Sequence, residues 1–169
     1  MGKVDIKKKA AIEKISGYLL ENGLNNTGIR ALAQAAGTSD RMLIYYFGTK
    51  DELLNQVLGS IAAGVTVQLD ALLGTDVRSA DLLLEELTAV VSQPFFKPAI
   101  QLWFELVGLA VRGSEPYLAN AKLFSDNWIQ WIESRIEAPT AEKATDLYAH
   151  LEGRLMIQLI QQPDALQSA

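Results

Sequence analysis

The spacing of apolar residues constrains the fold of this chain more than any other feature. Apolar positions recur every three or four residues along its length, and no segment alternates apolar and polar residues for long enough to form a convincing strand. Because 49% of the residues are apolar and 21% are charged, the chain can bury a real core. The sequence therefore predicts an all-α protein. Its 169 residues suit one compact domain, or a small amino-terminal head fused to a larger body that shares its core.

Start and stop signals divide the chain into about eight or nine helices with short loops. Asn22-Gly23 offers a left-handed cap for the first helix, and Gly74 ends a long one that begins after Thr49. The Thr49 hydroxyl and the Glu52 carboxylate have the spacing of a reciprocal capping box. The predicted helices span residues 5–21, 28–35, 39–46, 50–73, 79–92, 98–112, 116–137 and 141–161, and residues 163–169 are expected to fray.

Composition argues against several classes of protein. The chain has no cysteine and one histidine, so we expect no disulfide, no structural metal and no cofactor. The lysine-rich amino terminus lacks the apolar run and the cleavage site of a signal peptide. The most apolar stretches, residues 100–111 and 155–160, are too short to span a bilayer. We therefore expect a cytoplasmic protein without a membrane partner.

Charge is distributed unevenly along the chain. The formal net charge is −5, which by itself argues against a nucleic-acid partner. However, residues 1–50 carry eight Lys and Arg against four acidic residues, whereas residues 51–169 carry seven against sixteen. A basic head on an acidic body is compatible with a head that binds phosphates.

Residues 29–54 form the most informative segment, because their spacing suits a helix-turn-helix at 28–47. Ala33 is small where two steeply crossing helices must approach, and Gly37 tolerates the positive φ that the turn requires. Thr27 and Ser39 stand where the N-caps of the second and third helices belong. Four further residues recur at intervals that point them inward from both helices: Leu32, Ala36, Leu43 and Phe47.

This segment also resembles the amino-terminal signature of the TetR (TetR/AcrR) family of regulators. The close resemblance covers about residues 8–55, and beyond them only the helical layout and the tail of residues 151–166 look similar. The matching residues are Thr27, Leu32-Ala33, Ala35-Ala36-Gly37-Thr38-Ser39, Leu43, Phe47, Thr49-Lys50 and Leu53. The sequence departs from the signature at Ile44, where the family has a tyrosine that contacts phosphate, and either Tyr45 or Tyr46 is a candidate substitute.

The resemblance implies a DNA-binding surface on the third helix and its neighbours. Four residues would meet base edges in the major groove: Asp40, Arg41, Met42 and Tyr45. Thr27, Ser39, Tyr46 and Lys50 would contact phosphates, Arg30 could serve either role, and Thr38 belongs to the same set. The alternative is that Thr27 and Ser39 only cap helices, that the tyrosines only pack, and that the lysines at 7–9 form a solvated face.

The body is expected to hold an effector pocket and a dimer interface. Among its many aromatic residues, Trp103, Phe124 and Trp128 are the candidates to line a pocket for a small apolar or aromatic molecule, with Gln101, Glu105, Asn127 and His150 as polar anchors. The alternative is that these aromatics are core. The last helix is apolar on nearly all sides towards its end, so a second subunit could cover it at Gly153, Met156, Ile157 and Ile160. Alternatively, it is the central helix of a monomer.

Together these features predict a ligand-responsive transcriptional regulator rather than an enzyme. In this interpretation residues 1–49 form the DNA-binding head and residues 50–169 the ligand-binding and dimerisation body. A homodimer would repress by binding a near-palindromic operator and would be released by the effector. No glycine-rich phosphate loop, nucleophile elbow or metal motif favours an enzyme. A helical carrier without DNA binding is the other rival, and Arg41, Lys50 and the basic head argue against it.

Overall fold

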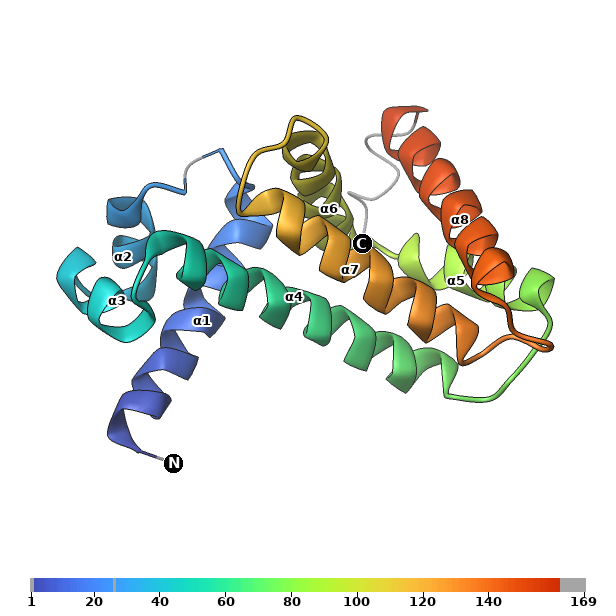
Figure 1. Cartoon of the computed structure of the whole chain (residues 1–169), viewed down its shortest axis with the longest axis horizontal. Coiled ribbons are helices and arrows are strands. Elements are labelled where there is room, and N and C mark those ends of the chain that lie inside the picture. Colours follow the sequence, from blue (N-terminus) through green and yellow to red (C-terminus); the bar gives the residue numbers. More distant parts are fainter. Residues whose placement is uncertain (1, 26, 162–169) are drawn as a thin grey trace. The chain divides into compact units, whose positions relative to one another are not determined.

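The computed structural model describes residues 2–25 and 27–161, and these are helical along most of their length (Figure 1). The prediction of an all-α fold is confirmed. The described residues form eight α-helices and one 3-10 helix: α1 (Lys3–Asn22), α2 (Ile29–Ala36), α3 (Asp40–Phe47), α4 (Lys50–Leu73), α5 (Ala80–Val91), η1 (Pro94–Phe96), α6 (Lys97–Ala110), α7 (Tyr117–Glu133) and α8 (Ala141–Gln161). The tail expected to fray, together with the end of the segment 151–166, lies outside the described residues.

Local signals set the helix ends around the turn as predicted. Gly37 has φ 68° and ψ 38°, the left-handed conformation that glycine adopts without strain, and it ends α2. The Ser39 hydroxyl accepts from the Met42 amide at 3.3 Å and caps α3. The capping box at the start of α4 is also present: Thr49 N donates to the Glu52 carboxylate at 2.9 Å, and Glu52 N donates to the Thr49 hydroxyl at 3.1 Å.

The described residues fall into two compact units, each built from two stretches of chain. The first unit comprises the residues up to Gly64 together with Gln101–Ala121. The second comprises Val65–Ile100 and the residues from Lys122 onwards. The helices α4, α6 and α7 therefore each contribute residues to both units.

Aliphatic side chains form the core of the first unit. Ile15 and Leu19 of α1 are completely buried, as are Leu32 of α2 and Leu43 of α3. The beginning of α4 adds four more side chains with almost no exposure: Leu53, Leu54, Val57 and Leu58. Burial of this kind is the main stabilising contribution to such a small helical assembly.

The second unit contains the close packing of α5 against α8. Leu83 and Leu87 of α5 are completely buried, and on α8 the buried residues include Leu151 and Leu155. The α8 residues lie four apart and thus share one helix face. In the same unit the ring of Trp128 stacks on that of Tyr148, with the ring centroids 6.2 Å apart and the planes 12° from parallel. Burial raises the pKa of the Tyr148 hydroxyl well above its ordinary range.

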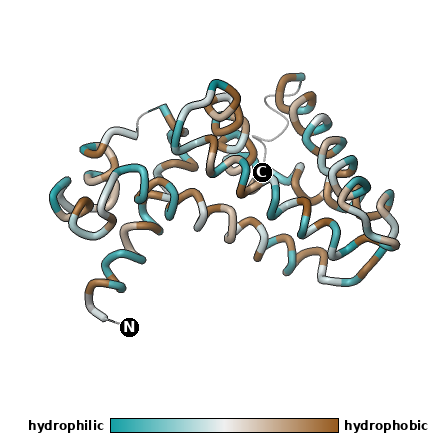
Figure 2. The backbone as a smooth tube through the Cα atoms, in the orientation of Figure 1, coloured by the Kyte–Doolittle hydropathy of each residue, from teal (hydrophilic) through white to brown (hydrophobic). Residues whose placement is uncertain are grey.

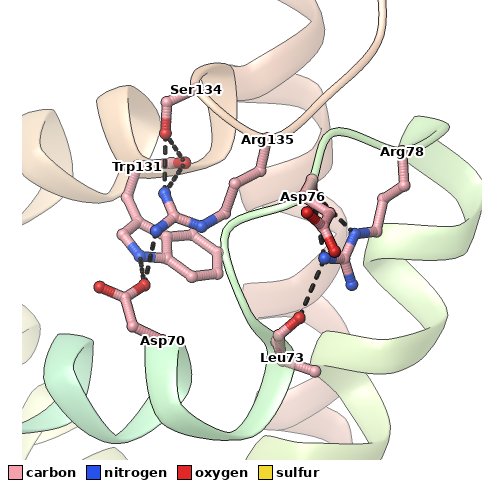
Figure 3. A network of polar contacts seen from close by, with 7 residues as sticks. All are labelled: Asp70, Leu73, Asp76, Arg78, Trp131, Ser134 and Arg135. Carbon is pink, nitrogen blue, oxygen red and sulfur yellow. Dashed lines mark hydrogen bonds and ion pairs between the residues drawn. The ribbon is translucent and has the colours of Figure 1, made fainter.

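A buried arginine joins the ends of α4 and α7 in the second unit (Figure 3). The Asp70 carboxylate on α4 accepts from Arg135 at 2.5 Å and from the Trp131 indole nitrogen at 2.9 Å. The Arg135 guanidinium also lies over the Trp131 ring, 4.0 Å from its centroid. We define Asp70, Trp131 and Arg135 as the Asp70 clamp.

The predicted end of α7, at residue 137, was wrong, because the helix stops at Glu133. Residues 134 and 135 form a turn, and the chain then pairs with the segment before α5: Arg78 N donates to Arg135 O, and Glu137 N donates to Arg78 O, both at 2.9 Å. The Arg78 guanidinium binds the carbonyls of Leu73 and Asp76 and forms an ion pair with Glu86. For the Glu137 amide, the bond to Arg78 takes the place of the helical bond that the periodicity predicted.

Among the helices of the described residues, only α4 has a length and composition that would also suit a membrane span. Its most apolar window has a mean hydropathy of 1.4, and Figure 2 shows hydrophobic colours over much of its length. The sequence prediction of no membrane partner did not consider this stretch. One such helix is weak evidence for a span, and α4 here begins with Lys50, Asp51 and Glu52 and contributes Leu53 and Leu54 to the core of the first unit.

Candidate nucleic-acid interface

The third helix has a buried face and an exposed face. Leu43, Tyr46 and Phe47 are buried, whereas Arg41 and Tyr45 are exposed. The exposed residues lie four apart, so they project from one side of α3. A helix with a basic and an aromatic side chain on its free face can enter a DNA major groove and read base edges.

The sequence offered either Tyr45 or Tyr46 as the substitute for the phosphate-contacting tyrosine, and the structure distinguishes between these two residues. The Tyr45 side chain is 70% exposed, whereas Tyr46 is 7% exposed and its ring packs edge-on against Phe47. Tyr46 therefore belongs to the core of the first unit, and we leave it out of the proposed DNA surface. The signal was present in the sequence, since Tyr46 follows the inward Leu43 by three residues.

Thr27 does not cap the second helix as expected. The N-cap of α2 is Gly28, and Thr27 is 8% exposed with its hydroxyl 3.2 Å from that of Tyr117 at the start of α7. A buried hydroxyl with this partner does not face solvent, where a phosphate would lie. We therefore leave Thr27 out of the proposed DNA surface as well.

The remaining predicted DNA residues lie on or beside α3. The Arg30 side chain on α2 is 94% exposed and forms a long ion pair of 3.8 Å with Asp40, which is weak because both side chains are solvated. Ser39 and Lys50 are exposed at the start of α3 and α4, and Thr38 and Met42 are half-buried. Asp40, one of the residues predicted to meet base edges, is thus the partner of Arg30 in this ion pair.

Two lysines of α1 contact this region, which the sequence did not predict. Lys14 Nζ donates to the carbonyl of Ala36 at 3.3 Å, so a cation caps the carboxyl end of α2. Lys8 Nζ lies 5.7 Å from the centre of the Phe47 ring. Both contacts hold α1 against the helix-turn-helix.

Helices α6 and α7 also contact the connection between α1 and α2 within the first unit. The carboxylate of Glu105, one of the predicted polar anchors, accepts from the Leu24 amide at 2.7 Å. Further along, Asn120 Nδ2 donates to Asn55 Oδ1 of α4 at 2.5 Å. The segment Gln101–Ala121 thus supports the helix-turn-helix.

The residues predicted to line a pocket are all half-buried. Trp103 lies in the part of α6 that belongs to the first unit, whereas Phe124 and Trp128 lie in the part of α7 that belongs to the second. Trp128 packs against Trp131, with ring centroids 5.7 Å apart, and against Tyr148. The ring contacts of Trp128 fit a core position as well as a pocket position.

The residues predicted to form a dimer interface share the carboxyl-terminal part of α8. Met156 and Ile157 are about half-exposed, and Ile160 is 73% exposed. Gly153 is half-buried, and a Cβ added to it would meet no atom within 4 Å. This end of α8 therefore presents an apolar surface next to a position without a side chain.

Comparisons with known proteins identify the helix-turn-helix. The family model described as "Bacterial regulatory proteins, tetR family" matches residues 18–57, which run from α1 into α4. No curated protein sequence matches the chain.

Solved structures share the fold along most of the chain. A proposed transcriptional regulator, SCO7518, of Streptomyces coelicolor A3(2) superposes with a TM-score of 0.75 at 20% identity, over 92% of this chain and 88% of that one. A proposed TetR-family transcriptional regulator of a Rhodococcus species gives 0.74 at 19% identity, over 95% of this chain and 93% of that one. The chain therefore carries a helix-turn-helix segment similar to that of the tetR family of bacterial regulatory proteins, and it shares its fold with these two solved structures.

Proposed function

We propose that this protein is a cytoplasmic homodimeric repressor that binds a near-palindromic operator and is released by a small apolar or aromatic effector. The exposed face of α3, with Arg41 and Tyr45, is the observation that carries the DNA-binding part. In this proposal residues 1–49 read DNA, and residues 50–169 bind the effector and dimerise.

Each side chain on this surface has a role that its chemistry suits. Arg41 can donate two hydrogen bonds to a guanine, and Tyr45 can contact bases or the backbone from the same face. Lys50, Ser39 and Arg30 lie beside α3, where they would hold phosphates. The positive amino ends of α2 and α4 add favourable dipoles for the same anions.

A salt titration on random-sequence duplex DNA, followed by selection of preferred sites, tests DNA binding. Lys50→Ala should weaken binding to all sequences and reduce the salt slope by about 0.9, the value for one phosphate contact. Arg41→Ala should instead relax the selected sequence at one position, at a cost of about 1–3 kcal/mol. Lys122→Ala, which removes an exposed lysine of the second unit, is the matched control and should change neither.

Two other outcomes would change the interpretation. If the wild type does not bind duplex DNA even at low salt, the chain is not a DNA reader, and a helical carrier becomes the better interpretation. If the protein binds DNA but the selected site has no two-fold symmetry, the proposal that a homodimer binds a near-palindromic operator fails.

The homodimer is proposed from the apolar end of α8. Met156, Ile157 and Ile160 together expose aliphatic surface that a second copy of the same helix would cover, and Gly153 would allow close approach. Two heads on one dimer would then occupy successive major grooves, about 34–36 Å apart. Sedimentation of the wild type at several concentrations tests the oligomeric state directly.

The effector is proposed from the aromatic residues of α6 and α7. An effector that binds better to a conformation with wrongly spaced heads would lower operator affinity through that difference. Quenching of tryptophan fluorescence by a panel of aromatic compounds, combined with release of the selected duplex, tests this part. A compound that quenches without releasing DNA would count against effector control.

A further inference from the structure

The connection between α1 and α2 is held at two points by the segment Gln101–Ala121. At its beginning, the half-buried Glu105 carboxylate accepts from the Leu24 amide at 2.7 Å. At its end, the buried Thr27 hydroxyl lies 3.2 Å from the Tyr117 hydroxyl. All four residues belong to the first unit, so the two contacts lie within one compact body.

Gly23 leaves room for the Glu105 carboxylate. A Cβ on Gly23 would lie 2.5 and 2.6 Å from the two carboxylate oxygens, which is closer than atoms can approach. Gly23 also has φ 70°, in the region that disfavours side chains. The close approach of Glu105 to this turn therefore depends on glycine.

The electrostatics of this contact are unfavourable apart from the hydrogen bond. The carboxylate lies next to the carboxyl end of α1, where the helix dipole is negative and where no basic residue stands in the last turn. A carboxylate kept at such a place is better explained by its geometric effect on the connection than by general stabilisation.

We propose that Glu105 is a positioning residue for DNA reading. By accepting from Leu24, it fixes the connection that leads into α2 and so places Arg30 and the amino end of α2 beside α3. Tyr117 acts at the other end of the connection through Thr27. This inference rests on the proposed DNA-binding function, and it assigns Glu105 to the support of the DNA-binding surface rather than to an effector site.

The sign of the expected effect separates positioning from simple electrostatics. Removing a negative charge from a DNA-binding unit should by itself strengthen binding to duplex DNA. Loss of the Leu24 contact should do the opposite for the specific site, since the connection would then spend only part of the time in the binding-competent position. If that fraction is about one tenth, the affinity falls about tenfold.

The experiment compares Glu105→Ala, which removes the acceptor of the Leu24 amide, with Glu115→Ala. Both substitutions remove one acidic charge from the first unit, but the exposed Glu115 has no role in the contact. Binding is measured with labelled duplex carrying the site that the wild type selects, and with random-sequence duplex, over a range of salt concentrations. Exchange of the Leu24 amide hydrogen is followed in the same proteins, and thermal melting shows that each is folded.

We expect Glu105→Ala to bind the selected site about tenfold more weakly than the wild type and to show faster exchange of the Leu24 amide hydrogen. Its binding to random-sequence duplex should be unchanged or slightly stronger, and its salt slope should be unchanged. Tyr117→Phe, which changes no charge, should also weaken specific binding. If Glu105→Ala binds the selected site as well as Glu115→Ala does, Glu105 does not position the head, although the DNA-binding function stands. If the wild type binds no duplex, the proposed function fails and this inference fails with it.

Discussion

Replacing Asp70 by alanine should destabilise the second unit strongly. In the Asp70 clamp one carboxylate oxygen accepts both from the Arg135 guanidinium and from the Trp131 indole. The Arg135 side chain is only 9% exposed, so its charge would be left without a counter-charge in a poorly solvated place. The Nε atom of Arg135 already has no hydrogen-bond partner, which leaves the guanidinium few alternatives.

The size of the effect follows from the burial of the two partners. Removing one partner of a buried ion pair costs about 3–5 kcal/mol. Because the Asp70 side chain is itself partly exposed, water can partly replace it, and a loss of about 2–3 kcal/mol is the better estimate. For a chain of this length, that loss corresponds to a fall in Tm of about 5–10 °C.

Differential scanning calorimetry of three variants measures this. Asp70→Ala should show the full fall, and Asp70→Asn a smaller one, because an amide oxygen can still accept from Trp131. Asp76→Ala is the matched control: it removes an exposed acid of the same unit whose contacts with Arg78 use only its backbone carbonyl. If Asp70→Ala melts within 2 °C of Asp76→Ala, by the same scale the clamp contributes less than about 1 kcal/mol, and the reasoning is refuted.

Three further predictions concern other parts of the chain. Gly48→Ala should lower the free energy of unfolding by about 1–2 kcal/mol. The reason is that Gly48 has φ 84° and that a Cβ at this position would press on the Glu52 carboxylate. Urea unfolding curves that match those of the wild type would contradict this. Burial raises the pKa of Tyr148, so above about pH 10 the folded state keeps a proton that the unfolded state loses. The free energy of unfolding should therefore fall as the pH rises beyond that point. Tyr148→Phe should make this dependence on pH less steep. Ile157→Asp with Ile160→Asp should convert the proposed dimer into a folded monomer in sedimentation, and a variant that remains dimeric would exclude this face of α8.

The helix-turn-helix was predictable from the sequence because its signals are local. The positive φ of Gly37, the Ser39 cap and the Thr49–Glu52 box each depend on residues within one turn of helix. Helix periodicity also placed Leu43 and Phe47 inward correctly. Applied to Tyr46, the same periodicity would have assigned that residue to the core.

The errors arose where residues far apart in the sequence determine the local structure. Arg135 lies on a pattern that continues α7, but it stands in a turn after the helix and contacts Asp70, 65 residues earlier. The contact of Glu105 with Leu24 was missed in the same way, because the two residues lie 81 apart in the sequence. Neither pairing leaves a signal in the spacing of a single sequence.

The division of the chain into two discontinuous units affects how the protein is made. The first unit needs Gln101–Ala121, which leave the ribosome only after the chain has begun the second unit with Val65–Ile100. The packing of the amino-terminal helices therefore stays incomplete during synthesis. Leu53 and Leu54 of α4 can already cover these helices, but Glu105 and Tyr117 have not yet been synthesised. We expect a nascent chain that ends at Gly64 to be partly ordered and sensitive to proteases, and protection of its α1–α2 connection to appear once residue 121 has emerged.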